Sequence, residues 1–289
     1  MGKDKQLRTT MIVMLKGFII GSSMSVPGVS GGTMAIILGI YDKLISSISR
    51  FTKDLKGNII FLMKFCIGAG IGIFTLSKLI EWLLEVAPFS VSFFFLGAVI
   101  GGIPALYEKT GIKGYKLNIS FLLYFLLGLI IVISIGFIPT GAISVTLGSG
   151  IAHYMMLLVT GIIIALALVL PGISTAHMLL VLGMYETMIT AISNFDIFYV
   201  GILGVVTIVG IFMITKPIEW TMNKFPYETY CIVIGFVIGS TFEIFRAKII
   251  PAIPANADIS WWISSALIAI ITFVFGIRAI MHISKFSND

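Results

Sequence analysis

One nine-residue motif occurs twice in this chain of 289 residues. The first copy reads VPGVSGGTM (26–34) and the second reads LPGISTAHM (170–178). The match continues from LGIYD (38–42) to LGMYE (182–186), and the two copies keep a spacing of 144 residues, the distance from position 27 to position 171. An internal repeat of this period fills half the chain and predicts a duplicated fold.

A second pair of matches follows the motif in both copies. KLIEW (78–82) recurs as KPIEW (216–220), and GAVIG (97–101) recurs as GFVIG (235–239). The spacing here is 138 residues, so the second copy is slightly shorter between the motif and this block. A collinear series of this length predicts two structural repeats, at residues 1–144 and 145–289, within one integral membrane domain.

The composition indicates a protein that lies mostly in lipid. Hydrophobic residues make up 58% of the chain and charged residues 11%, against roughly 25% charged in an average soluble domain. Together with apolar runs close to the length of a membrane span, this predicts an all-α polytopic membrane protein with membrane lipids around it. The net charge of +6 does not indicate a nucleic-acid partner, because basic residues in membrane proteins mainly set orientation.

Each repeat is expected to begin with a re-entrant helical hairpin. The apolar stretch at 11–24 is too short to cross a hydrocarbon core of about 30 Å. Pro27-Gly28 then breaks the chain, and a second apolar piece extends from about residue 32 to residue 48. We expect the same hairpin around Pro171-Gly172, because duplicated halves should fold alike.

Three transmembrane helices are expected after each hairpin. The predicted spans lie near 59–84, 89–107 and 119–138 in the first repeat, and near 197–220, 228–245 and 261–281 in the second. An odd number of crossings per half inserts the second half upside down, so the fold is predicted to consist of two inverted-topology repeats. The distribution of Lys and Arg then places both termini in the cytoplasm, with Arg246 and Lys248 as the exceptions.

The repeated loops have the composition of an anion site. Helices are expected to begin near Ser30 and Ser174, and helix N-termini present unpaired N–H groups to phosphate or carboxylate. Hydroxyl groups and glycines beside them would add donors and allow close approach. The neighbouring candidates are Gly31, Gly32, Thr33 and Thr175. The simpler alternative is that Pro-Gly breaks the helices and the two serines only cap the next ones.

Three further sets of ionisable residues are candidates. His177 replaces the threonine of the first copy, and an ionisable group at membrane depth is a functional candidate for binding phosphate or carrying a proton. Lys78 and Glu81 share a helix face, as do Lys216 and Glu219, so the lysines could attract an anion and the glutamates could couple protons. The alternatives are a histidine bonded to a nearby carbonyl group and side chains that reach the membrane surface.

At these motifs the chain resembles the bacterial polyprenyl-phosphate transporter family over nearly its whole length. The resemblance implies a flippase of the bacterial cytoplasmic membrane that returns undecaprenyl phosphate from the outer to the inner leaflet, where the lipid carrier is used again in cell-wall synthesis. The residues that match the family motif are Pro27, Gly28, Ser30, Gly31, Gly32, Pro171, Gly172 and Ser174. Thr175-Ala176-His177 departs from the Gly-Ser-aromatic sequence that is more usual there.

Two other functions are weighed against a lipid transporter, for which no enzymatic activity, cofactor or metal is expected. A membrane polyprenyl-diphosphate phosphatase would carry Arg after the loop serine and a pair of glutamates, whereas this chain has Gly31 and Thr175 after its serines. A small-anion channel or exchanger could use the same helix N-termini to bind a halide. The sequence leaves open whether the chain forms homo-oligomers.

Overall fold

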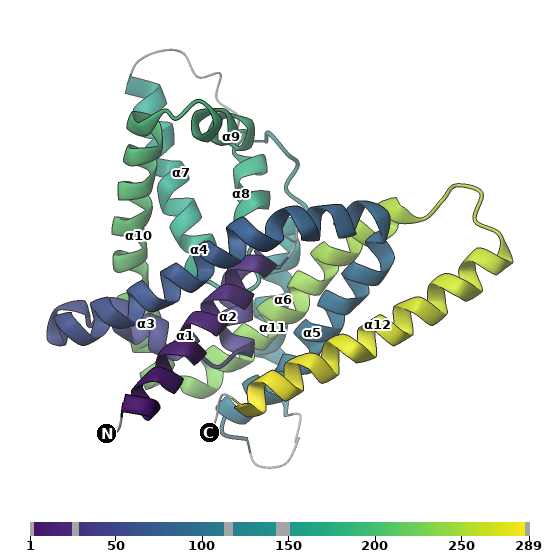
Figure 1. Ribbon diagram of the computed structural model, residues 1–289, viewed down its shortest axis with the longest axis horizontal. Coiled ribbons are helices and arrows are strands. Elements are labelled where there is room, and N and C mark those ends of the chain that lie inside the picture. The colour runs from purple at the N-terminus through teal and green to yellow at the C-terminus, as the bar shows by residue number, and fades with distance from the viewer. Residues whose placement is uncertain (1–2, 25–28, 113–117, 143–150, 287–289) are drawn as a thin grey trace.

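The computed structural model describes residues 3–24, 29–112, 118–142 and 151–286, and these residues form α-helices joined by short turns (Figure 1). The helices of the first half are α1 (Lys3–Ser23), α2 (Gly31–Ile37), α3 (Tyr41–Ser49), α4 (Leu55–Val86), α5 (Pro88–Lys109) and α6 (Ile119–Gly136). Those of the second half are α7 (Ile151–Val169), α8 (Thr175–Val181), α9 (Tyr185–Ser193), α10 (Ile197–Lys224), α11 (Pro226–Ile244) and α12 (Ile259–Phe286). The same order of long and short helices therefore occurs twice.

Six helices of the described chain, α4, α5, α6, α10, α11 and α12, are long and apolar enough to cross a membrane. They begin and end within a few residues of the predicted spans, which confirms the class of all-helical, multi-pass membrane protein. Figure 1 shows α3 toward the lower left of the molecule and α9 at its top. The inverted relation of the two halves stays a prediction.

The apolar piece that follows each Pro-Gly loop is not one helix. The prediction of a continuous segment from 32 to 48 is wrong: the chain bends by 115° between α2 and α3, and by 109° between α8 and α9. Gly39 (φ +65°) and Gly183 (φ +66°) occupy the turns. A positive φ of this kind is strained for residues with a Cβ, so the repeated Leu-Gly-x-Tyr sequence is a turn that ends one short helix and begins the next.

Glycines bring several helix pairs into close backbone contact. A Cβ added at Gly72 of α4 would overlap the carbonyl oxygen of Phe18 in α1, and one added at Gly97 of α5 would overlap that of Phe273 in α12. Such small-residue interfaces are characteristic of helix packing in membranes. The partners also cross between halves, because α12 packs on α5 and α6 packs on α11. The two halves are thereby interlocked.

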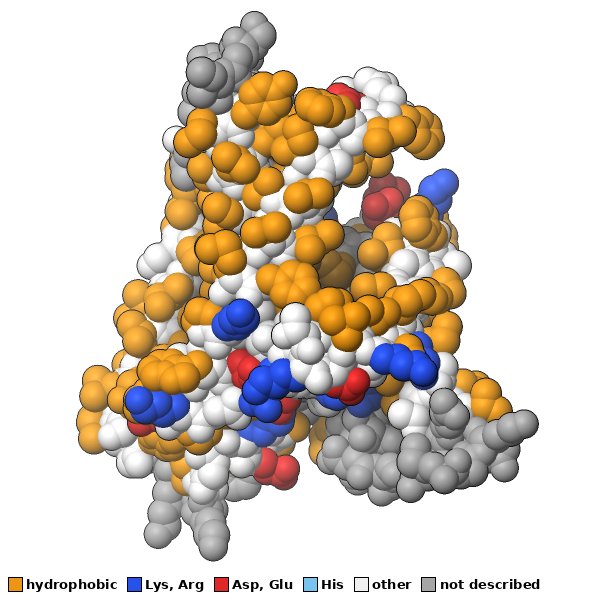
Figure 2. Space-filling view, turned by 90° about the vertical axis from the view of Figure 1, so that its left-hand side faces the viewer, with side chains coloured by type: hydrophobic (Ala, Val, Ile, Leu, Met, Phe, Trp, Pro, Cys, Tyr) orange, Lys and Arg blue, Asp and Glu red, His pale blue; other side chains and the backbone are white. Residues whose placement is uncertain are grey.

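The surface agrees with insertion in a bilayer. Large apolar side chains such as Phe74, Ile130 and Val205 are more than half exposed. Figure 2 shows hydrophobic side chains over the upper part of one face and a band of Lys and Arg side chains across its lower part. Basic side chains at one level of a membrane protein are expected at the cytoplasmic headgroups.

We expect Gly72→Ala to lower thermal stability while Gly70→Ala does not. Both glycines lie in α4, and alanine is favoured over glycine in a helix by about 1 kcal/mol. Only the Gly72 substitution pushes a Cβ into the backbone of α1, whereas no described atom beyond the local helix backbone lies within 4 Å of a Cβ at Gly70. Thermal unfolding of both variants in detergent measures the difference, and equal midpoints would contradict this account of helix packing.

Candidate functional site

The two repeated loops meet inside the protein. The Gly172 N–H donates a hydrogen bond to Oγ1 of Thr33 over 2.8 Å, although the two residues are half a chain apart. The hydroxyl of Tyr41 donates to the carbonyl oxygen of Val169, also over 2.8 Å. Polar backbone that is not part of a helix must find partners within a membrane protein, and here side chains of the first half supply partners for backbone groups of the second.

The described residues at the end of the first loop are mostly buried. Ser30 is 3% exposed and Thr33 is fully buried. Gly32 lies against the backbone of Leu170 and Pro171, so the glycine permits the close approach of the two loops. The Ser30 hydroxyl is buried and has no hydrogen-bond partner among the described residues. Pro27 and Gly28, which the sequence assigned to this site, lie outside the described residues.

The second loop borders an open cavity instead. Ser174 and His177 line a cavity of about 420 Å³ together with Glu243 and Arg246. Oγ of Ser174 accepts a hydrogen bond from the His177 N–H over 3.4 Å and so caps α8. Thr175 is partly exposed and does not line the cavity, whereas Pro171 and Gly172 are buried and Pro171 lines a different cavity beside Tyr41.

Glu243 connects the charged groups of this cavity. Its Oε1 lies 3.6 Å from Nδ1 of His177, and its Oε2 lies 3.4 Å from a guanidinium nitrogen of Arg246. Nε2 of His177 is 3.2 Å from the carbonyl oxygen of Ile135. His177 therefore lies between the carboxylate of Glu243 and a backbone carbonyl group. The guanidinium group also lies over the ring of Phe137, which orients it.

Arg246 and Glu243 were missed as site residues in the sequence. Arg246 lies in a π-helical turn (η2, Phe245–Ile249) that directly follows α11, and π-turns often occur at functional sites. The available signal was its position: Arg246 and Lys248 are the two basic residues on the side of the membrane that is otherwise predicted to have none. The position of Arg246 in a cavity beside the second loop explains this exception to the distribution of basic residues better than an effect on membrane orientation does.

The loop helices are shorter than the sequence suggested. α2 and α8 have seven residues each, so their dipoles extend over two turns only. A larger share of any attraction for an anion must then come from side chains. The described part of the cavity supplies one guanidinium group, from Arg246, next to the hydroxyl of Ser174 and the ring of His177.

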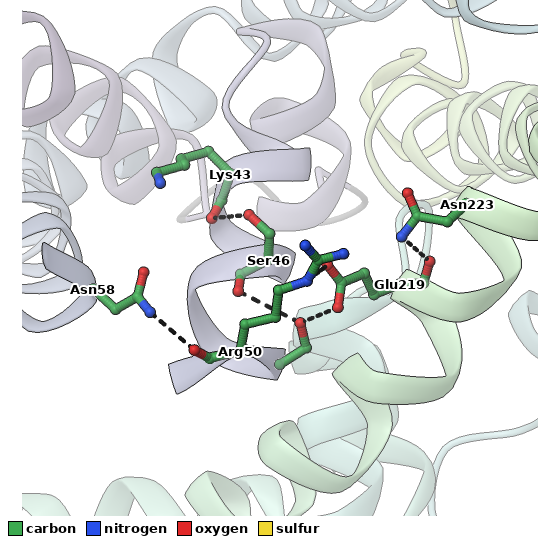
Figure 3. Close-up of polar contacts among 7 residues, drawn as sticks. Lys43, Ser46, Arg50, Asn58, Glu219 and Asn223 are labelled. Atoms are coloured by element: carbon green, nitrogen blue, oxygen red, sulfur yellow. Dashed lines mark hydrogen bonds and ion pairs between the residues drawn. The ribbon is translucent and has the colours of Figure 1, made fainter. Parts of the chain in front are cut away.

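The structure does not bring the repeated Lys/Glu pairs to the loops. Lys78, Lys216 and Glu81 are exposed, and no hydrogen bond or ion pair within the described chain joins either lysine to a loop residue. Glu219 is different, because its side chain is only 16% exposed. It forms an ion pair with Arg50, which follows α3, and accepts a hydrogen bond from Ser49, the last residue of α3. Figure 3 shows this contact.

Comparison with known proteins agrees with the sequence motifs. A family model described as undecaprenyl phosphate translocase-like matches residues 20–262. The chain belongs to this family. It is 34% identical to a polyprenyl-phosphate transporter of Staphylococcus aureus over 91% of this chain and 93% of that protein. It is 30% identical to a polyprenyl-phosphate transporter of Vibrio cholerae over 87% of this chain and 80% of that protein. No solved structure matches it.

The contact between the loops gives a prediction for stability. Thr33→Val keeps the shape of the side chain but leaves the buried Gly172 N–H without its acceptor, which should lower the free energy of unfolding by about 1–3 kcal/mol. Thr33→Ser keeps the acceptor and is expected to lower the free energy of unfolding by less. Thermal unfolding in detergent distinguishes the two variants, and a valine variant as stable as the wild type would argue against a role of this bond.

Proposed function

We propose that this protein transports undecaprenyl phosphate, or a similar polyprenyl phosphate, from the outer to the inner leaflet of the bacterial cytoplasmic membrane. In this role it is a transporter and not an enzyme, and it returns the lipid carrier of cell-wall synthesis for further use. Both termini lie in the cytoplasm. The observation that carries the proposal is the cavity beside the second loop, where Arg246, Ser174 and His177 converge in a chain whose relatives are named polyprenyl-phosphate transporters.

The lining of this cavity suits a phosphate monoester. A guanidinium group binds phosphate oxygens through two parallel hydrogen bonds, and Arg246 is the cation that the lining offers. The hydroxyl of Ser174 and the ring of His177 add donors from the same lining. Glu243 forms an ion pair with this guanidinium group. Arriving phosphate takes the place of this carboxylate, so Arg246 is never left without an anionic partner.

The same cavity offers apolar contacts to the lipid chain. Phe137, Ile138 and Leu180 lie among its lining residues, next to the polar cluster. The first isoprene units of the substrate would pack against these side chains while the rest of the chain stays in the bilayer. Only the charged headgroup then has to be shielded from hydrocarbon during transport, and this shielding removes most of the free-energy cost of moving the charge through the membrane.

Transfer to the other leaflet requires the first loop to open. Ser30 corresponds to Ser174 in the repeat, and its buried hydroxyl has no partner among the described residues. In the inverted arrangement of two repeats, movement of one half against the other exposes a central site to each side in turn. The headgroup would then pass from Ser174 to Ser30, with Gly31 and Gly32 leaving room for it. We assign proton coupling to His177, because a proton there offsets the negative charge that phosphate brings beside Glu243.

Purified protein in liposomes tests this function directly. Vesicles that contain undecaprenyl phosphate are treated from outside with a phosphatase that cannot cross the membrane. Without the transporter only the lipid of the outer leaflet is hydrolysed, whereas the active protein should expose the lipid of both leaflets. Phosphate release without added phosphatase would indicate the membrane phosphatase instead, and chloride flux without lipid movement would indicate the anion channel.

Arg246→Gln should weaken binding of undecaprenyl phosphate at least about tenfold, because it removes a charge-assisted hydrogen bond worth about 1.5–3 kcal/mol. Arg246→Lys keeps the charge without the bidentate geometry, so its affinity should lie between those of the wild type and of Arg246→Gln. The matched control is Lys248→Gln, which removes the same charge from a residue outside the cavity lining. Thermal stabilisation by added lipid measures the affinities. Equal losses in Arg246→Gln and Lys248→Gln would reject the cavity as the headgroup site.

A further inference from the structure

Helix α3 is fixed to the second half at its C-terminal end. The Ser49 hydroxyl donates to Oε2 of Glu219 over 2.5 Å, and Nε of Arg50 lies 2.6 Å from Oε1 of the same carboxylate. Figure 3 shows Arg50 and Glu219 facing each other between α3 and α10. We call these two bonds the Glu219 contact. An Arg–carboxylate bond supported by a hydroxyl is among the stronger polar contacts in proteins.

The N-terminal end of α3 is held as well. Asp42 forms an ion pair with Lys109 at the end of α5 and accepts a hydrogen bond from the Tyr230 hydroxyl of α11 over 3.0 Å. Apolar packing accompanies these bonds, because Tyr41 and Ile45 of α3 are buried in the main core. Helix α3 therefore closes one end of the protein against both α10 and α11.

The repeat supplies a counterpart for each residue of this closure. By the spacings of the two copies, Ser49 corresponds to Ser193, Asp42 corresponds to Glu186, and Glu219 corresponds to Glu81. Ser193 ends α9 and Glu81 lies in α4, so the same pair of helices exists on the other half. In the structure Glu81, Glu186 and Ser193 are all exposed, and within the described ranges their side chains form no hydrogen bond or ion pair.

Packing differs between the halves in the same way. Six of the seven residues of α2 are buried, whereas in α8 only Leu179 and Val181 are buried. α3 packs on α10, but α9 has no comparable packing against α4 and belongs to a separate core with α7 and α10. Ser174 and His177 line a cavity of about 420 Å³, whereas the equivalent residues Ser30 and Thr33 are buried. One end of the protein is closed and the other is open.

We propose that Ser193 docks on Glu81 when the transporter closes over the second loop, and that the Glu219 contact breaks in the same transition. This inference rests on the proposed transport function and assigns Glu81 and Glu219 to two alternating gates. This role differs from the proton coupling predicted for them, because here each carboxylate accepts a hydrogen bond from the serine that ends α3 or α9. The two gates cannot both be closed while the headgroup exchanges with a leaflet.

One substitution between the copies makes the gates unequal. Asn194 stands where the first copy has Arg50, so the end of α9 brings no cation to the carboxylate of Glu81. An amide donor bonds a carboxylate less strongly than a guanidinium group does. The closed state of the second gate is therefore the weaker of the two, which explains why the structure is closed at α3 and open at α9.

Paired cysteines test the exchange of gates. The native Cys66 and Cys231 are first replaced, and the pairs Ser49→Cys/Glu219→Cys and Glu81→Cys/Ser193→Cys are introduced together in one chain in liposomes. A disulfide requires Cα atoms within about 7 Å, so it reports a closed gate. We expect the first disulfide in lipid-free vesicles, and the second to increase several-fold when undecaprenyl phosphate is added. Mass spectrometry should find no molecule that contains both.

The matched control replaces Glu81→Cys by Leu79→Cys, which lies on another face of α4 and should not cross-link to position 193. Molecules with both disulfides would overturn the proposal, as would a protein that moves lipid but never forms the 81–193 bond. A protein that moves no lipid would refute the proposed function alone, since the mutual exclusion of the two disulfides is measured without transport.

Discussion

The rest of this structure depends on the need to satisfy polar backbone inside a membrane. Two breaks in the helices bring non-helical peptide groups to the interior, and lipid offers them no hydrogen-bond partners. The bond from the Gly172 N–H to Thr33 shows the solution, in which a backbone group in the loop of the second half is satisfied by a side chain of α2 in the first. The interlocked pairs α5–α12 and α6–α11 hold the halves in the position that this contact requires. A duplicated chain can use the same sequence of helices and loop around both breaks.

Much of this fold could be predicted because its signals are long and periodic. Apolar runs gave the six spans, and the repeat gave the common order of helices in the two halves, whereas the re-entrant course of the hairpins stays a prediction. The turn at Gly39 was missed, although Leu-Gly-x-Tyr occurs twice, because hydropathy continues through it unchanged. Only a positive φ at the glycine marks the break, and a hydropathy pattern contains no information about backbone dihedral angles.

The candidate site was predictable only in part. Ser174 and His177 were predicted to bind substrate because they lie in the motif itself; they line the cavity, and their role stays a prediction. Arg246 and Glu243 come from the end of α11 and reach the cavity through tertiary packing and a π-helical turn, which leave no local signal. The misplaced positive charge was a usable clue. Lys78 and Lys216 were favoured because they repeat, yet repetition alone does not distinguish a binding residue from one at the membrane surface.

The direction of lipid movement can be measured in cells. A probe for the phosphate headgroup reports undecaprenyl phosphate at the outer leaflet of a strain that lacks this protein and any redundant transporter. The account predicts a higher surface signal on deletion, restored by the wild-type protein but not by the Ser30→Ala/Ser174→Ala variant expressed at an equal level. An unchanged surface signal on deletion would contradict it.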